Sequence, residues 1–286
     1  MKYLQQVLAT ISVVLAAGVS VTAHAADTLA KALGEGKIVV GVKTDYIPWG
    51  LRDSQGNIVG YEVDIIKDIA EQISKKAGKP LKVELVPVTT PNRMDFLQQG
   101  RVDVVIATMS ISPERQKLIG FVTPPYYSSG ASVLTTKASG INGWASVKGK
   151  TLCSIQGGWY VKDPGQSHGA EVLTFKGVPE IESALVAGRC AGWLYDTSAL
   201  VSKKLSEPQK WADYELATPD YGDASWAIGV RKEDLDAPLG KAIQDGLIEM
   251  HRSGKVLALL KKWNMPEVAS LVKMKDECIA KDPACN

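Results

Sequence analysis

The stretch with the clearest chemical potential lies directly after the apolar run 102–107. Its residues are Ala107-Thr-Met-Ser-Ile-Ser-Pro-Glu-Arg115. Ser112 is a favoured N-cap residue and Pro113 is favoured at the first helical position, so a helix should begin here. The free backbone N–H groups of a helix start, together with the helix dipole, attract an anion. The stretch therefore predicts an anion-binding site.

Side chains in this stretch suit a carboxylate. Arg115 presents a planar set of donors that can bind both oxygens of one carboxylate. Ser110 and Ser112 offer hydroxyls to the same group, and Thr108 directly follows the apolar run. The alternative is an ordinary capped helix whose arginine is solvated. On local pattern alone both interpretations stand.

Alternating strands and helices must position this site. Apolar or alternating runs predict strands, and apolar residues at three-to-four spacing predict a helix that stops at Gly78. The expected elements are strands at 37–42, 81–88 and 102–107, a helix through 66–73, and a short helix from Asn92 to Gly100. This order predicts a doubly wound α/β lobe, a parallel sheet with helices on both faces.

The alternation then begins a second time, which predicts a second lobe. After a strand at 133–136, we expect strands at 150–155, 191–195 and 225–230, a helix at 178–186, and closing helices at 237–250 and 255–263. A chain of 286 residues is long enough for two domains of ordinary size.

The first residues predict export to the periplasm. Lys2, the apolar run 7–21 and the small residues Ala23 and Ala25 form a signal-peptide pattern, with cleavage after Ala25. The alternative, a membrane anchor, needs about 20 apolar residues. Removing Lys2 from the 33 basic residues leaves 32 against 31 acidic ones, without a basic block. This balance argues against nucleic acid as a partner.

Two motifs resemble those of bacterial periplasmic solute-binding proteins that serve polar amino-acid ABC transporters. One combines 107–115 with Phe121-Val-Thr-Pro-Pro-Tyr-Tyr127, and the other is Gly60-Tyr-Glu-Val-Asp-Ile-Ile-Lys-Asp-Ile-Ala70. The similarity spans about residues 37–265. It implies a type II periplasmic binding protein, with two doubly wound lobes joined by two hinge crossings. Lobe 1 would comprise 26–132 and 229–286, and lobe 2 would comprise 133–228.

The resemblance also implies a function. Such a protein is no enzyme: it binds an amino acid, acts as a monomer and delivers its ligand to the membrane permease of an ABC importer. Arg115 would bind the α-carboxylate and Asp196 would pair with the α-ammonium group. Asp196 has a second interpretation as the N-cap of a helix from Thr197, and both roles can hold together.

Further candidates follow the ends of predicted strands, where ligands bind in such sheets. Lys43 follows the first strand, and Tyr46 and Trp49 in the next loop are candidates to cover the ligand. Either aromatic is more often simple packing. Gly158 and Trp159 stand where similar proteins usually carry Thr, so backbone amides remain and the hydroxyls are lost. Trp159 could cover the ligand or fill part of the pocket.

Lys43 and Arg93 indicate an acidic ligand. In similar proteins that bind basic amino acids, an acidic residue commonly occupies the position of Lys43. Aspartate/glutamate-binding members carry a Val-Gly-Val-Lys pattern and an arginine where this chain has Arg93. The two cations would bind a second carboxylate, so we expect L-aspartate or L-glutamate first, then glutamine or asparagine. The alternative is that both are solvated surface charges.

The four cysteines should form disulfides in an oxidising compartment. Cys278 and Cys285 are close in sequence and should pair. Cys153 and Cys190 flank one predicted helical unit, and some similar proteins carry cysteine at both places, so we expect the second bridge there. Two buried free thiols are the alternative.

The sequence contains no common catalytic or metal-binding motif. Gly-x-Ser-x-Gly and His-Glu-x-x-His are absent. The two histidines of the mature chain, His168 and His251, are far apart and expected at the surface. We expect no cofactor and no metal. The alternatives are a secreted enzyme of the same fold, of dehydratase type with Asp196 as acid or base, and a soluble partner that presents ligand to a sensor.

Overall fold

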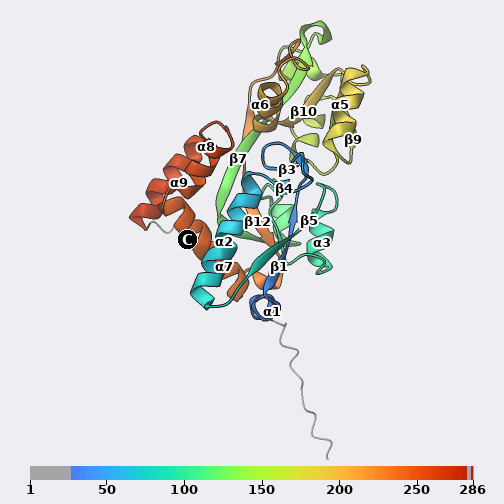
Figure 1. Ribbon diagram of the computed structural model, residues 1–286. Coiled ribbons are helices and arrows are strands. Elements are labelled where there is room, and N and C mark those ends of the chain that lie inside the picture. The colour runs from blue at the N-terminus through green and yellow to red at the C-terminus, as the bar shows by residue number, and fades with distance from the viewer. Residues whose placement is uncertain (1–26, 282–284, 286) are drawn as a thin grey trace, which may run out of the picture.

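The computed structural model describes residues 27–281 and Cys285 (Figure 1). The predicted signal peptide and its cleavage site after Ala25 lie outside the described residues. None of the helices in the described part of the chain is long and apolar enough to span a membrane.

Within the described residues, a nine-stranded mixed sheet runs through the whole molecule. Its order is β5-β1-β6-β12-β7-β10-β8-β9, with β11 paired to β7. The strands are β1 (Lys37–Val42), β5 (Lys82–Pro87), β6 (Val104–Val105), β7 (Gly120–Thr136), β8 (Thr151–Ile155), β9 (Glu171–Phe175), β10 (Gly192–Asp196), β11 (Tyr214–Leu216) and β12 (Tyr221–Val230). A small second sheet contains β2 (Asp45–Tyr46), β3 (Gly50–Arg52) and β4 (Ile58–Val59).

The sheet divides into two lobes joined by its two longest strands. In lobe 1, β5, β1 and β6 are mutually parallel, and in lobe 2, β10, β8 and β9 are mutually parallel. The strands β7 and β12 lie between these groups, pair antiparallel with each other and extend from one lobe into the other (Figure 1). These are the two crossings that the sequence predicted.

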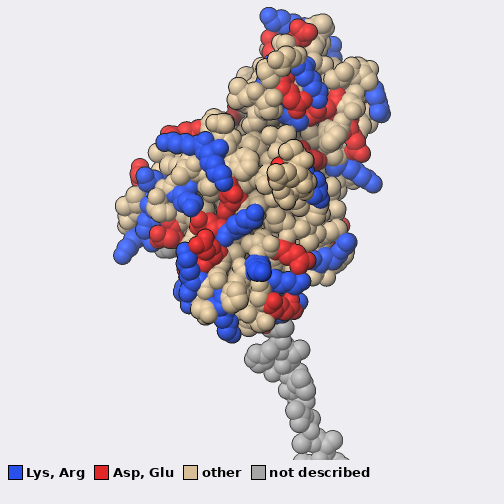
Figure 2. Space-filling view, in the orientation of Figure 1, with Lys and Arg blue, Asp and Glu red and all other residues tan. Residues whose placement is uncertain are grey.

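Helices cover the sheet in both lobes. Lobe 1 carries α1 (Thr28–Glu35), α2 (Tyr61–Ala77), α3 (Arg93–Gln98), α4 (Pro113–Gln116), α7 (Pro238–Arg252), α8 (Lys255–Lys262) and α9 (Ala269–Ala280). Lobe 2 carries α5 (Val178–Val186) and α6 (Thr197–Ser206) (Figure 1). On the face visible in Figure 2, Lys and Arg alternate with Asp and Glu, as expected for a chain of near-neutral charge.

Both faces of the lobe 1 sheet are buried. Val104 packs into the large core that contains the apolar side of α2, whereas Val105 packs into a separate core with Leu97 of α3. Neighbouring strand residues point to opposite faces, so β6 must be apolar on both sides. This arrangement confirms the predicted doubly wound α/β class.

Several elements differ from the prediction. The strand expected at 102–107 is regular only at β6, and the one expected at 133–136 is the end of the much longer β7. Pro124 and Pro125 hid the length of β7, because proline usually excludes a strand. Here both prolines lie where the register between β7 and β12 shifts, so no ladder hydrogen bond is required of them. The elements α1, β2, β3, β4, β9, β11 and α9 were not predicted.

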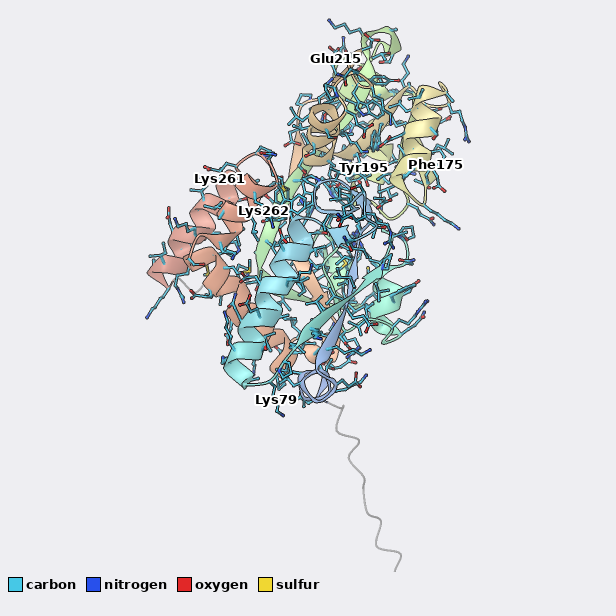
Figure 3. All side chains as sticks on the ribbon, viewed as in Figure 1. Lys79, Phe175, Tyr195, Glu215, Lys261 and Lys262 are labelled. Carbon is cyan, nitrogen blue, oxygen red and sulfur yellow. A yellow bond between two sulfur atoms is a disulfide. The ribbon has the colours of Figure 1, made fainter. Side chains whose placement is uncertain are left out.

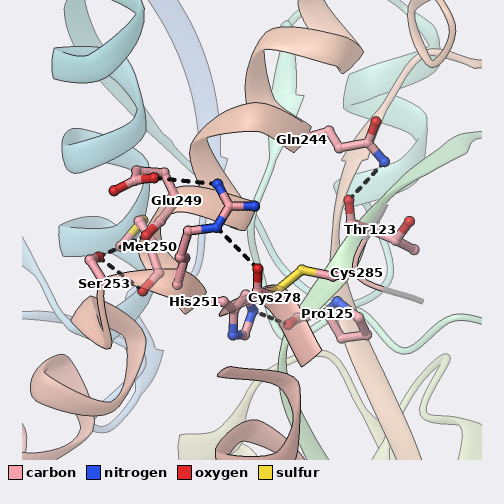
Figure 4. The surroundings of a disulfide bond; sticks show 10 residues. Thr123, Pro125, Gln244, Glu249, Met250, His251, Ser253, Cys278 and Cys285 are labelled. Atoms are coloured by element: carbon pink, nitrogen blue, oxygen red, sulfur yellow. Dashed lines mark hydrogen bonds and ion pairs between the residues drawn. A yellow bond between two sulfur atoms is a disulfide. The ribbon is translucent and has the colours of Figure 1, made fainter. Parts of the chain in front are cut away.

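Both predicted disulfides are present. Cys153 of β8 is bonded to Cys190, which lies two residues before β10, with the Cα atoms 5.5 Å apart. Cys278 near the end of α9 is bonded to Cys285, with the Cα atoms 5.2 Å apart (Figure 4). The alternative of two free thiols is therefore wrong.

The expectation that His251 lies at the surface is also wrong. Its side chain is 1% exposed, and its Nε2 atom lies 2.8 Å from the carbonyl oxygen of Pro125 (Figure 4). The Nδ1 atom is buried and has no partner among the described residues. Burial lowers the pKa of this imidazole from 6.5 to about 4, because the core does not solvate its cation. His251 is buried because it lies on the apolar face of α7, and the expectation considered only its polar side chain.

This histidine should make stability depend on pH. Between about pH 6.5 and pH 4 the unfolded chain binds a proton at His251 and the folded chain does not, so the free energy of unfolding falls as pH falls. Over that window the loss from this one group is about 3 kcal/mol. Urea denaturation at pH 7 and pH 4 should show that His251→Gln, whose amide can still donate to Pro125, loses less stability than the parent. An equal loss in both proteins would contradict the assignment.

Candidate functional site

The carboxyl ends of strands from both lobes meet around one small cavity, which we call the interlobe cavity. Lys43 follows β1, Thr90 follows β5 and Thr108 follows β6, while Asp196 ends β10 on the opposite side. In Figure 3, Tyr195 of β10 marks the junction of the lobes. The lining residues are Lys43, Thr90, Arg93, Thr108, Ser110, Arg115, Gly158, Trp159, Tyr160 and Asp196.

Eight of the ten predicted ligand-binding residues line this cavity. The other two are the aromatic residues proposed to cover the ligand. Tyr46 donates a hydrogen bond from its hydroxyl to the carboxylate of Asp196, so it contacts a lining residue without lining the cavity itself. Trp49 is fully buried and packs edge-on against Tyr127 and Trp226 of the crossing strands, at centroid distances of 5.3 and 5.6 Å. The structure therefore places Trp49 in the core behind the cavity.

Two residues that line the cavity, Thr90 and Tyr160, were not among the ligand-binding residues predicted from the sequence. Thr90 obeys the rule used for Lys43, because it lies just beyond the carboxyl end of β5, and the same rule could have found it. Tyr160 comes two residues after Gly158, and its hydroxyl lies 3.4 Å from Asp196 Oδ2. A β-carbon at position 158 would lie 2.7 Å from Cε2 of Tyr160. Gly158 thus makes room for the tyrosine.

The predicted helix start is correct but short. Ser112 Oγ accepts from the backbone N–H of Arg115 at 3.3 Å, and Pro113 occupies the first turn of α4, which has only four residues. The guanidinium group of Arg115 extends into the cavity, where Nη1 donates to the Ser110 carbonyl and Nη2 to the Gly157 carbonyl of lobe 2, each at 2.8 Å. Burial, and secondarily Arg93, lowers the pKa of Arg115 to about 10.

Arg93 and Lys43 are buried, at 3% and 2% exposure, so they are not solvated surface charges. Arg93 Nη1 donates to the carbonyl oxygens of Ala107 and Thr108, the latter at 3.0 Å. Lys43 Nζ lies 4.1 Å from the ring centroid of Tyr46. Burial lowers the pKa of Lys43 to about 8, although nearby carboxylates oppose the shift. A compact ammonium group desolvated in this way favours an anionic partner.

Glu62 of α2 holds the loop that carries Thr108. Its Oε1 atom accepts from the backbone N–H of Thr108 at 2.6 Å and from the Tyr126 hydroxyl at 2.5 Å. Thr108 has φ 49°, a left-handed conformation that costs a β-branched residue free energy. Burial raises the pKa of Glu62, while these hydrogen bonds and the cations Lys43 and Arg93 oppose the rise. Glu62 therefore positions the end of β6.

Asp196 occupies the N-cap position of α6 but makes no capping hydrogen bond with its side chain. The carboxylate instead accepts from the hydroxyls of Tyr46 and Tyr160 and is 5% exposed. Burial raises its pKa, and the two tyrosines with Lys43 and Arg93 limit the rise. Two roles were considered for Asp196, the helix cap and the partner of a ligand's ammonium group. Its side chain lines the cavity and does not cap α6, which matches the second role.

Comparison with known proteins identifies the family. The model for bacterial extracellular solute-binding proteins, family 3, matches residues 38–266. The chain belongs to this family. The ABC transporter glutamine-binding protein GlnH of Bacillus subtilis is 32% identical over 240 residues, covering 83% of this chain and 84% of that protein. The glutamate/aspartate import solute-binding protein of Salmonella typhimurium is 28% identical over 247 residues, covering 84% and 80% respectively.

A solved structure supports the same conclusion. The crystal structure of a mutant of ArgBP from T. maritima matches with a TM-score of 0.73 at 27% identity, covering 82% of this chain and 98% of that chain. The architecture is therefore that of type II periplasmic binding proteins. The names of these family 3 relatives differ in the amino acid, so the ligand has to be argued from the site itself.

The charges in this family 3 site do not balance. Lys43, Arg93 and Arg115 line the cavity with Asp196, and Glu62 lies directly behind it. Among the lining residues three cations therefore face one carboxylate, and the carboxylates of Glu62 and Asp45 act on Lys43 from outside the lining. Among the described residues, no group of three or more His, Cys, Asp or Glu side chains could hold a metal ion.

Removing Glu62 should be costly, because two buried donors would lose their acceptor and two cations would lose a nearby carboxylate. We expect Glu62→Ala to lower the free energy of unfolding by about 2–5 kcal/mol, measured by urea denaturation. The exposed Glu71 on the same helix, which pairs only with Lys75, is the matched control. Glu71→Ala should cost about 0.5 kcal/mol or less. Equal effects of the two substitutions would refute the positioning role of Glu62.

Proposed function

We propose that this family 3 protein is the extracytoplasmic substrate-binding component of an amino-acid ABC importer, and that its ligand is acidic, L-aspartate or L-glutamate. It acts in the periplasm as a monomer, and its partner is a membrane permease. The observation that carries the ligand proposal is the convergence of Lys43, Arg93 and Arg115 on one small cavity that contains a single lining carboxylate, Asp196.

Charge balance favours an acidic amino acid over a neutral or basic one. Among the lining residues, three cations meet one carboxylate, while Glu62 and Asp45 act on Lys43 from outside the lining. An acidic amino acid has two carboxylates and one ammonium group, so its carboxylates can pair with the lining cations while its ammonium group pairs with Asp196. Arginine or lysine would instead add a further positive charge beside the three lining cations, in a space where desolvation makes that charge costly.

The geometry suggests an orientation for the ligand. Asp196 would accept the α-ammonium group, and Arg115 would bind the α-carboxylate by exchanging its bonds to backbone carbonyls for a charged partner. Lys43 and Arg93 would then bind the side-chain carboxylate. Nε of Arg93 and Nε1 of Trp159 are buried donors without a partner among the described residues, and both residues line the cavity. Buried donors of this kind favour a ligand rich in acceptor oxygens.

Binding would involve closure of the lobes around the ligand. We propose that lobe 1 (26–132 and 229–286) and lobe 2 (133–228) rotate about the crossing strands β7 and β12. The cavity is lined by side chains from both lobes and is too small for an amino acid, so a ligand can enter only if the lobes separate. The alternative enzyme of the same fold would convert its ligand, so mass spectrometry of the ligand recovered after incubation distinguishes the two functions.

Arg115 should be required for binding of every amino acid, because it meets the group that all of them share. Charge-assisted hydrogen bonds are each worth about 1.5–3 kcal/mol, so Arg115→Ala should weaken binding tenfold to over a hundredfold. Arg115→Lys should also bind more weakly, because an ammonium group cannot form two parallel bonds to one carboxylate. Titration calorimetry that finds unchanged affinity in Arg115→Ala would remove this residue from the site.

Lys43 should determine the preference for an acidic side chain. We expect Lys43→Gln to weaken binding of glutamate about tenfold or more and to change binding of glutamine little. The matched control is Lys37→Gln at the opposite end of β1, where the lysine is exposed and pairs with Glu84. Competition among aspartate, glutamate, glutamine and arginine at neutral pH tests the proposal directly. Tightest binding of arginine would show that the assignment of the cations is wrong.

The preference should also depend on pH. With the lobes together, burial lowers the pKa of Lys43 to about 8, and a bound carboxylate would raise it. Affinity for glutamate relative to glutamine should therefore be constant below about pH 7 and fall above pH 8, towards about tenfold per pH unit. Taking the ratio cancels the titration of the α-ammonium group that both ligands share. A ratio that is independent of pH would contradict the role of Lys43.

A further inference from the structure

The N-cap residue of helix α5 in lobe 2 has no side chain that could accept from the first turn. That residue is Gly177, and Pro179 in the first turn has no N–H group. Glu180 accepts from the backbone N–H groups of Lys176 and Gly177, each at 3.0 Å. The first N–H group inside the helix belongs to Val178. It donates to Oδ2 of Asp45 at 3.2 Å, and Asp45 belongs to lobe 1.

Asp45 is therefore a helix cap supplied from the opposite lobe. It lies in β2, between Lys43, which lines the cavity, and Tyr46, which bonds to Asp196. Its own carboxylate is directed to a different place, the start of α5. A β-carbon added at Gly177 would lie 3.5 Å from Oδ2 of Asp45, so the two lobes are in close contact here.

We propose that Asp45 is a closing residue, whose bond to Val178 stabilises the closed arrangement of the lobes and thereby sets affinity for every ligand alike. The inference rests on the proposed function, because closure is read through ligand binding. Separation of the lobes would leave the start of α5 without this acceptor. The free energy of the contact therefore belongs to the closed state only, and it adds to the apparent affinity whatever the ligand is.

The hydrogen bond between Asp45 and the N–H group of Val178 should have a measurable effect on ligand affinity. A carboxylate at a helix N-terminus combines a hydrogen bond with a favourable dipole interaction, and α5 has nine residues. The side chain of Asp45 is half-buried, so solvent screens it only in part. We expect its loss to weaken binding about threefold to thirtyfold.

The donor can be removed separately from the acceptor. Val178→Pro deletes the N–H group at the first helical position, where proline is favoured. The preceding Gly177 has ψ 161°, an extended conformation that suits the residue before a proline. The substitution changes no charge, so it leaves the electrostatics around Lys43 unaltered. Asp45→Ala removes the acceptor, and Asp53→Ala, in an exposed turn whose carboxylate bonds only to nearby residues 55 and 57, is the matched control.

The test is a double-mutant cycle measured by titration calorimetry with glutamate and with glutamine. Val178→Pro should weaken binding of both ligands by the same factor, Asp45→Ala should weaken glutamine binding by a similar factor, and the double variant should be no weaker than the weaker single variant. Additive losses, or a loss confined to one ligand, would overturn the proposal. Asp53→Ala should bind as the parent does.

Amide hydrogen exchange at Val178 keeps the two proposals distinguishable. Its exchange should be faster in Asp45→Ala than in the parent, either at saturating ligand or in the ligand-free protein. Equal rates under both conditions would overturn the cap, whichever ligand binds. If no amino acid binds the parent, the proposed function fails, and the exchange rates still decide the role of Asp45.

Discussion

Five charged groups share a small space that water can scarcely enter, and most of the local structure follows from that constraint. Each desolvated charge needs partners nearby. Glu62 accepts hydrogen bonds from the N–H group of Thr108 and the hydroxyl of Tyr126. Asp196 accepts hydrogen bonds from two tyrosine hydroxyls. The left-handed backbone at Thr108 directs its N–H group to Glu62, so conformational strain there is offset by a charged hydrogen bond.

The crossing strands supply the rigid support for these charges. Trp49, Tyr127 and Trp226 form a fully buried aromatic contact at the point where β7 and β12 extend from one lobe into the other. The strands are antiparallel and long, and the register shift between Trp226 and Ile228 accommodates the two prolines of β7. The lobes are thereby joined through these two strands, which hold the charges of lobe 1 opposite Asp196.

Local patterns in the sequence predicted the features whose physical basis is local. The cap at Ser112 and Pro113, the strand ends that carry Lys43 and Asp196, and the pairing of the close cysteines 278 and 285 depend on neighbouring residues. The bond of Tyr160 to Asp196 depends on how distant elements pack, so no window of the chain could reveal it, whereas the burial of His251 follows from the apolar face of α7 on which it lies. Asp45 is the clearest case, because the helix that it caps begins at residue 178, beyond the reach of any local signal.

The loop after β8 suggests that ligand specificity and ligand affinity depend on different contacts in this site. Gly158 lacks the hydroxyl that similar proteins usually carry near this point, and a side chain there would collide with Tyr160. The tyrosine hydroxyl is directed to Asp196, away from the arginine that would hold the α-carboxylate. On the proposed function, that carboxylate would depend more heavily on Arg115, which also reaches lobe 2 through Gly157. The count of buried charges would select the ligand, and contacts between the lobes would set how tightly any selected ligand is held.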